Sequence, residues 1–284
     1  MRVDEYNSFE SLLIRYRHAL SELERCGVKV SEVSRLRVYE RCLQQIVLDP
    51  RPAVKAELVV AVTFDLREID EIVEIVEHLP DSLDRVTRDL LNKITGGSES
   101  PDIESGAAAR EAQYELYLGT VFRRAGIRVR HGAPDLVASW HDQEFFLEAK
   151  RPSSLARVDD RLRSAVHQIR KLSSPGIIAL SLDQVLRPSG RLLSVGGFDD
   201  LAPAVVQLVQ SFVLDHVGLW RNRLTGEPVA ALFMTARIPG RLSSTGHSVL
   251  GSNLHVEMLS ISTDGFDVSH FIEQAATAYL SAQK

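Results

Sequence analysis

Apolar residues recur at spacings of three and four from Ser8 to Thr95, and this period predicts helices rather than strands. Glycine, proline and capping residues interrupt the pattern and divide the region into separate helices. The predicted helices cover residues 8–27, residues 31–50 with Ser31 as the cap, residues 53–78, and residues 81–96 with Asp81 as the cap. The first third of the chain is therefore expected to be an all-helical domain.

The stretch of residues 96–106 combines glycine, serine, one proline and acidic residues, which is the composition of an exposed connection. It predicts a boundary in the chain. We expect a helical N-terminal domain at residues 1–97, a linker at 98–105, and a second domain with a C-terminal extension at 106–284.

Beyond residue 106, helical patterns alternate with short runs rich in β-branched and aromatic residues. The predicted order is a helix at 107–125, strands at 127–130, 135–140 and 144–149, a helix at 155–172 and a strand at 176–182. This order predicts an α/β (α+β) fold with a mixed sheet flanked by helices. Weaker patterns predict helices at 199–216 and 268–282, strands at 229–236 and 255–262, and a mobile loop at 239–253.

The net charge of −5 argues against a protein that coats nucleic acid through bulk electrostatics. The charge is unevenly distributed, however. Residues 106–175 contain 12 Lys and Arg against 8 Asp and Glu, a net charge of +4. The segment with the mixed pattern is thus the one whose charge suits a phosphate backbone.

The start of the chain lacks a basic stretch followed by an apolar run, and no segment reads as the roughly 18 apolar residues that span a membrane. Cys26 and Cys42 belong to no CxxC or Cys/His cluster, so they predict reduced thiols and no zinc site. We therefore expect a cytoplasmic protein without a membrane partner.

Three charged residues surround the predicted turn at 141–144. Asp135 begins one strand, and Glu148 and Lys150 end the next, so a hairpin brings their ends together. Glu148 and Lys150 are two residues apart and should share one face of the sheet. Two carboxylates can hold Mg²⁺ or Mn²⁺, which acidifies a bound water and neutralises charge on a phosphate. The ammonium of Lys150 can orient or deprotonate the attacking water, or stabilise the transition state.

Pro134-Asp135 followed by Glu148-Ala149-Lys150 resembles the PD-(D/E)xK nuclease superfamily, which includes many restriction endonucleases. In the preceding helix, Glu115 matches the acidic residue about three turns before a glycine that assists metal binding in that family. In the following helix, Gln168 resembles the active-site glutamine or lysine that many members carry. The resemblance covers residues 106–182 only.

This resemblance implies a restriction-endonuclease-like fold and a metal-dependent nuclease. Its catalytic residues would be Asp135, Glu148, Lys150, Glu115 and Gln168, and the first two would bind the metal with Glu115. DNA is the implied substrate, in restriction, anti-phage defence or repair. The helical domain would then bind a protein partner, a second copy of the chain or the substrate.

Alternatives remain at each level. Glu148 and Lys150 could form a solvated charge pair, worth only about 0–1 kcal/mol. Glu111 competes with Glu115 as the third carboxylate, because it lies closer to the apolar stripe of its helix. The protein could also be an inactive nuclease-like fold that binds nucleic acid or serves in assembly, or a nuclease that acts on RNA.

Overall fold

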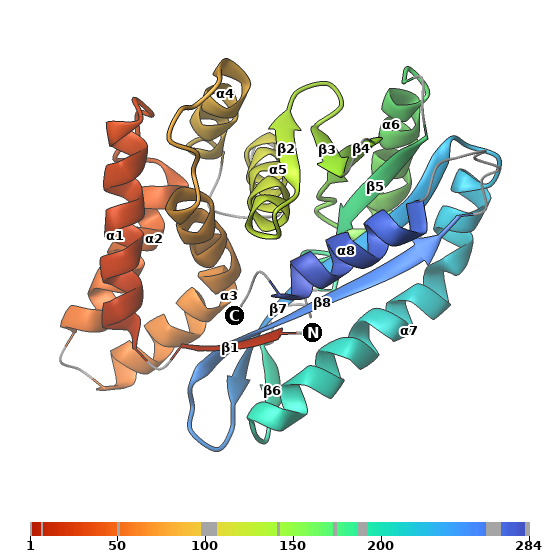
Figure 1. Ribbon diagram of the computed structural model, residues 1–284. Coiled ribbons are helices and arrows are strands. Elements are labelled where there is room, and N and C mark those ends of the chain that lie inside the picture. The colour runs from red at the N-terminus through yellow and green to blue at the C-terminus, as the bar shows by residue number, and fades with distance from the viewer. Residues whose placement is uncertain are drawn as a thin grey trace.

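A mixed sheet with helices on both faces forms the centre of the protein, as a computed structural model shows (Figure 1). The structure describes residues 2–6, 8–49, 52–97, 107–140, 143–172, 175–186, 192–259 and 268–281. The helices are α1 (Phe9–Arg25), α2 (Arg35–Leu48), α3 (Pro52–Glu77), α4 (Arg85–Ile94), α5 (Ala107–Arg124), α6 (Val158–Ile169), α7 (Phe198–Leu224) and α8 (Val268–Ser281), with a 3-10 turn at Leu155–Arg157. The strands are β1 (Arg2–Tyr6), β2 (Arg128–His131), β3 (Leu136–Trp140), β4 (Gln143–Lys150), β5 (Gly176–Ser181), β6 (Leu193–Val195), β7 (Val229–Leu242) and β8 (Ser248–Met258).

The eight described strands form one sheet in the order β1-β8-β7-β5-β4-β3-β2, with β6 beside β7. Strands β2, β3 and β4 pair as an antiparallel meander. Strand β4 is parallel to β5, and β5 is parallel to β7. The sheet is therefore mixed, as the sequence predicted, and β4 lies in its interior.

Two hydrophobic cores cover the faces of this sheet. On β5, Ile177 and Ala179 enter the core shared with α1–α5 and α8, whereas Ile178 and Leu180 enter the core shared with α6 and α7. This alternation follows from the two-residue period of a strand. A strand that is buried on both faces favours apolar residues on both, which explains the apolar run from Ile177 to Leu180 on β5.

The N-terminal region differs from the all-helical expectation in one element. Residues Arg2–Tyr6 form β1, which pairs antiparallel with β8 in a register that joins Arg2 to Ser252. Five residues give no clear period, and the partner strand is far away in the sequence, so no local pattern indicates this strand. Helices α1–α4 share one hydrophobic core with α5 and the sheet. The linker predicted at 98–105 lies outside the described residues.

Helix ends in this region follow their side-chain caps. Ser8 caps α1 by accepting a hydrogen bond from the Ser11 amide. Gly27 follows the helix with a φ of 81°, at the end that the sequence predicted. The predicted caps of the second and fourth helices are wrong by three residues. Ser34 and Asp84 fill these roles, because their side chains accept hydrogen bonds from amides three residues later.

The loop predicted at 239–253 is wrong, since β7 and β8 continue through most of it as a paired hairpin. Its glycines allow close packing. A Cβ at Gly240 would lie 2.7 Å from the Leu193 carbonyl oxygen of β6, and one at Gly251 would lie 2.7 Å from the Val205 side chain of α7. A glycine-rich stretch resembles a loop in sequence, although here neighbouring elements require the missing side chains.

Helix α7 extends eight residues beyond its predicted end at residue 216. Among the described helices it alone is long and apolar enough to cross a membrane, which the sequence analysis did not anticipate. Leu201, Val205 and Val209 on this helix are buried against the sheet. Length and composition alone do not establish a membrane span.

Candidate functional site

The β3–β4 hairpin brings Asp135, Glu148 and Lys150 into direct contact. The Lys150 ammonium lies 2.7 Å from Glu148 Oε2 and 3.2 Å from Asp135 Oδ2. The Ala149 amide donates a second hydrogen bond to Asp135 Oδ2 at 2.9 Å. Glu148 and Lys150 thus share a face, as their spacing predicted, and one nitrogen joins two carboxylates that are 13 residues apart in the sequence.

Burial makes this cluster electrostatically unusual. Burial raises the pKa of Glu148; Lys150 opposes this shift and Asp135 adds to it. For Lys150, burial alone would lower the pKa, but the two carboxylates hold it above its ordinary value. Glu148 Oε1 is buried and has no hydrogen-bond partner among the described residues. A buried carboxylate oxygen without a partner is costly, so the cluster lacks positive charge or a donor at this atom.

Glu115, on α5, faces the same cluster and contacts a residue that the sequence analysis missed. His131 Nδ1, at the end of β2, lies 3.1 Å from Glu115 Oε1. Burial raises the pKa of Glu115 to about 9, with Asp135 adding to the shift. Burial also lowers the pKa of His131 to about 4. Both groups are therefore neutral near pH 7, and one hydrogen bond joins the carboxyl group of Glu115 to the imidazole of His131.

A glycine permits this contact. A Cβ at Gly119, one helical turn after Glu115, would lie 2.9 Å from His131 Cε1. The imidazole therefore rests on α5 at the position where the helix has no side chain. This position of His131 fixes the side chain of Glu115.

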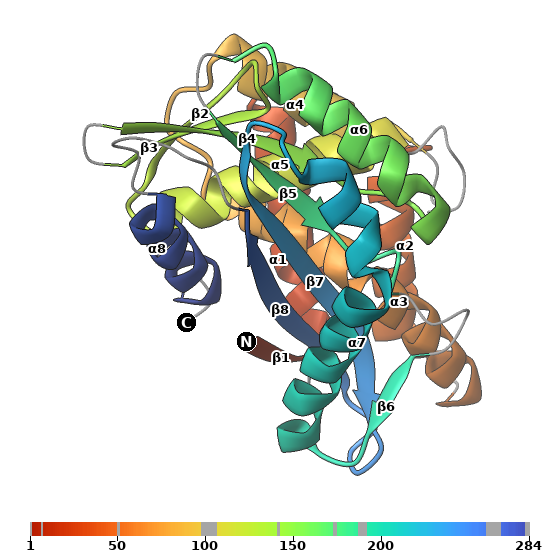
Figure 2. The same cartoon turned by 90° about the vertical axis from the view of Figure 1, so that its right-hand side faces the viewer.

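A cleft of about 270 Å³ opens between α4, α5, the end of β4 and α6. Figures 1 and 2 show α4 and α6 at the same end of the molecule as strands β2–β4. The residues that line it are Leu90, Lys93, Ala108, Glu111, Ala112, Glu115, Asp135, Ala149, Lys150, Arg161, Ser164 and Gln168. Gln168 Oε1 is buried without a hydrogen-bond partner in the described part of the chain. The cleft therefore brings together four of the five predicted site residues, while Glu148 lies buried beside Lys150.

Glu111 and Glu115 both reach the cleft, in different surroundings. Glu111 forms an ion pair with Arg161 at 3.2 Å. Burial has the largest effect on Glu111 and raises its pKa, and Arg161 and Lys150 only partly oppose this shift. Asp135 and Glu148 both raise the pKa of Glu115, whereas only Asp135 of these two contributes at Glu111. Glu115 is thus the carboxylate that is electrostatically linked to the whole cluster.

The carboxylates in and beside the cleft are the residues that could bind a metal ion. In the ranges that the structure describes, no group of three or more His, Cys, Asp or Glu side chains is arranged to hold a metal ion. The Lys150 ammonium lies against both Asp135 and Glu148. The chemistry of the residues nevertheless fits a hard cation. Glu148 has an unpartnered buried oxygen, and Glu115 carries a carboxyl group that a nearby positive charge would ionise.

Two residues of the site had no signal in the sequence. His131 ends a strand 16 residues after Glu115, and Lys93 belongs to the helical region that the sequence analysis assigned to another domain. Comparison with protein-family models, with curated proteins and with solved structures finds no match to this chain.

Proposed function

We propose that this protein is a metal-dependent nuclease that hydrolyses phosphodiester bonds, most naturally in DNA. The observation that carries the proposal is the contact of one lysine ammonium with two carboxylates at the base of a cleft. Metal-dependent phosphodiester hydrolysis uses a divalent cation held by carboxylates, together with a positively charged group that acts on the attacking water or the transition state. Asp135, Glu148 and Lys150 supply these groups.

The arrangement of the elements supports a restriction-endonuclease-like reading of the mixed sheet. Helix α5 precedes the β2–β3–β4 meander, and α6 and β5 follow it. This order places Glu115 on the helix before the hairpin and Gln168 on the helix after it, and both reach the cleft. The proposal therefore rests on the PD-(D/E)xK resemblance together with this convergence. Restriction, defence against foreign DNA or repair, in the cytoplasm, is the context that we infer.

Asp135, Glu148 and Glu115 would hold Mg²⁺ or Mn²⁺. When bound, the cation would lower the pKa of the attacking water and neutralise charge on the phosphate. The Ala149 amide, which donates to Asp135 Oδ2, orients this carboxylate. Glu115 would give up its proton on cation binding, and His131 would keep its side chain in place.

Lys150 would provide the group that acts at the reacting phosphate. Lys150 pairs with Asp135 and Glu148, and with these two carboxylates holding a cation its ammonium would donate to a phosphate oxygen or to the attacking water. Gln168, with its unpartnered carbonyl oxygen, would accept a hydrogen bond from that water and orient it. Neither residue needs to change its charge for these roles.

The test is incubation of the purified protein with plasmid, linear DNA and RNA, each with Mg²⁺, Mn²⁺ or EDTA. We expect cleavage of DNA with either cation and none with EDTA. Cleavage of RNA alone would redirect the proposal to an RNA nuclease. If no nucleic acid is cleaved with either cation, the proposal is wrong.

Two variants separate binding from chemistry. Lys150→Ala should abolish cleavage and weaken DNA binding only modestly, because it removes one phosphate-facing charge. Glu148→Ala should also abolish cleavage, but through lower affinity for Mg²⁺ in calorimetric titrations. Lys29→Ala, an exposed residue after α1 that changes charge equally, is the control and should cleave normally. Normal cleavage by both site variants would place the active site elsewhere.

One observation favours a second function, an inactive fold that binds nucleic acid. The Lys150 ammonium already pairs with both carboxylates, and the described residues contain no ready three-carboxylate set. In that case the wild type, Lys150→Ala and Glu148→Ala should bind DNA with equal affinity, and none should cleave it. The same assays therefore distinguish the two functions.

A further inference from the structure

Lys93, in the last turn of α4, lines the cleft that contains the proposed catalytic residues. Arg161 and Gln168 of α6 line the same cleft. The positive charge of Lys93 acts on Glu115: it lowers the pKa of this carboxyl group, against the larger effect of burial. The helical region is thus part of the cleft.

The position of this lysine is fixed by a buried arginine. Arg35, on α2, donates hydrogen bonds to the carbonyl oxygens of Ile94 at 3.1 Å and Gly96 at 3.3 Å, at the end of α4. The same guanidinium donates to Gln113 of α5 at 2.5 Å. Leu90, Leu91 and Ile94 pack in the core beside α5. The turn that carries Lys93 is therefore held against the segment of α5 that carries Glu111 and Glu115.

The cations of the cleft differ in their partners. Lys150 pairs with Asp135 and Glu148, and Arg161 pairs with Glu111 at 3.2 Å. Lys93 is exposed and forms no ion pair with a carboxylate of the described residues. It is the cation of this cleft that needs no partner exchange to meet an incoming anion.

We propose that Lys93 binds a backbone phosphate of the nucleic acid, next to the phosphate that is cleaved, and that the helical region thereby forms one wall of the substrate groove. This inference rests on the proposed function. An exposed ammonium on a fixed helix offers a point contact to a phosphate without reading the base. Lys93 would thus hold the strand in register over Asp135 and Lys150, and would contribute equally for every sequence.

The experiment measures the salt dependence of binding for a DNA duplex of about 20 base pairs, in EDTA, by fluorescence anisotropy. Loss of one phosphate contact should reduce the slope of log K against log salt by about 0.9. We expect this change for Lys93→Ala and expect Lys93→Arg to keep the wild-type slope, because either cation can contact a phosphate. With Mg²⁺, Lys93→Ala should raise KM and leave kcat nearly unchanged.

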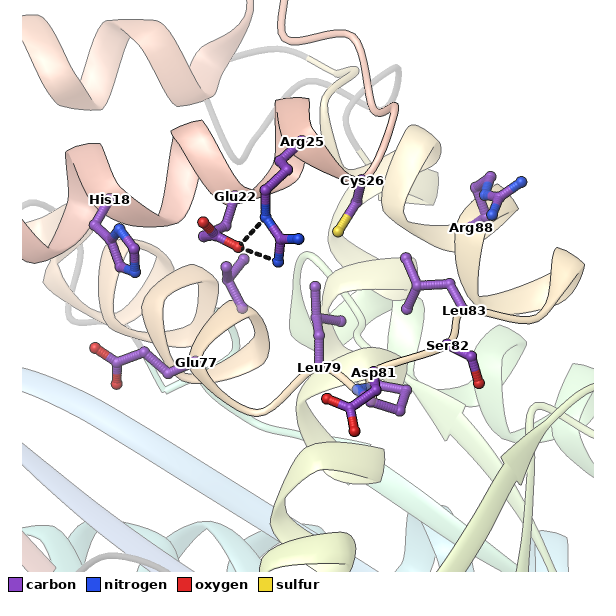
Figure 3. A pocket seen from close by; sticks show the side chains of 12 residues that line it. His18, Glu22, Arg25, Cys26, Glu77, Leu79, Asp81, Ser82, Leu83 and Arg88 are labelled. Carbon is purple, nitrogen blue, oxygen red and sulfur yellow. Dashed lines mark hydrogen bonds and ion pairs between the residues drawn. The ribbon is translucent and has the colours of Figure 1, made fainter.

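Arg88→Ala is the matched control, since it removes one positive charge from the same helix. Arg88 lies five residues earlier, about 140° around the helix from Lys93. It lines a separate cavity of about 660 Å³ between α1, α3 and α4, where Figure 3 shows it apart from the Glu22–Arg25 ion pair. The control should keep the wild-type slope and KM.

The outcomes separate the two proposals. If the wild type binds and cleaves DNA but Lys93→Ala matches Arg88→Ala in slope and KM, the role of Lys93 is wrong and the proposed function stands. A kcat that falls with unchanged KM also overturns the binding role. If the wild type neither binds nor cleaves nucleic acid, the proposed function fails and this inference fails with it.

Discussion

Lys150 and Arg151 are neighbours in the sequence, yet they enter two opposite charge environments. Lys150 faces the cleft, whereas Arg151 lies fully buried between α3, α5 and the end of β5. Arg151 donates to Glu71 at 2.6 and 2.9 Å and to Asp183 at 2.8 Å. Lys150 is the last residue of β4 and Arg151 directly follows it, so the end of this strand separates a candidate site from a structural network.

The carboxylates of the two environments shift in opposite directions. In the buried network, burial alone would raise the pKa of Asp183, but Arg67 and Arg151 hold it below its ordinary value. Around the cleft, burial prevails and the pKa values of Glu115 and Glu148 are raised. The network has enough guanidinium groups for its carboxylates, and the cleft cluster has too little positive charge. This difference is typical of a structural network beside a functional site.

Removal of a guanidinium from the network should have the largest effect on stability. Arg151→Met leaves Glu71 and Asp183 buried without their main partner, so the free energy of unfolding should fall by about 3–5 kcal/mol. Urea unfolding followed by circular dichroism measures it. Arg163→Met is the control, because its pair with Asp159 is largely exposed and is worth about 0–1 kcal/mol. Equal losses in the two variants would show that the network is not the stronger element.

Neutralisation of a cleft carboxyl should instead change how stability depends on pH. The pKa of Glu115 is raised to about 9 in the folded protein, so the folded state holds a proton that the unfolded state releases above about pH 4.5. Without metal, the wild type should lose up to about 1.4 kcal/mol per pH unit relative to Glu115→Gln between these limits. Denaturant unfolding in EDTA from pH 4 to 9 gives both curves.

The low end of this range is an internal control for Glu115→Gln. Below pH 4.5 the carboxyl is protonated in both states, so the two curves should run parallel there. Curves that stay parallel up to pH 9 would mean that Glu115 ionises normally and that the contrast with the network is absent. The variant should also bind Mg²⁺ more weakly if Glu115 is a ligand.

Two helical glycines give the smallest and most local comparison. Gly218 is an exposed residue of α7, and a Cβ there meets only Asn222 at 3.8 Å, so Gly218→Ala should stabilise the protein by about 0.5–1 kcal/mol. In Gly119→Ala the new Cβ would lie 2.9 Å from the His131 ring. This variant should therefore not gain stability, and the shifted imidazole should displace the side chain of Glu115. Thermal unfolding measures the first effect, and Mg²⁺ affinity or cleavage measures the second. Equal stabilisation with unchanged activity would show that His131 does not position Glu115.

The local features of this protein could be predicted from its residues alone. Ser8 and Gly27 mark the ends of α1 as expected, because capping and positive φ depend on residues within one turn. The spacing of Glu148 and Lys150 placed both on one face, since a strand has a two-residue period. The mixed sheet also followed from the order of helical and extended patterns.

Contacts between groups that are distant in the sequence depend on tertiary packing. Strand β1 forms by pairing with β8 at the edge of the sheet. The β7–β8 hairpin contains Gly240 and Gly251, where β6 and α7 pack too closely for a side chain. Arg151 and Glu71 are 80 residues apart, and Arg237 donates to Asp70 across 167 residues. Lys93 and His131 reach the cleft in the same way. Such contacts follow from the packing of whole helices and strands. The hydrophobic period and the structural propensity of a segment do not indicate which distant segment it will pack against.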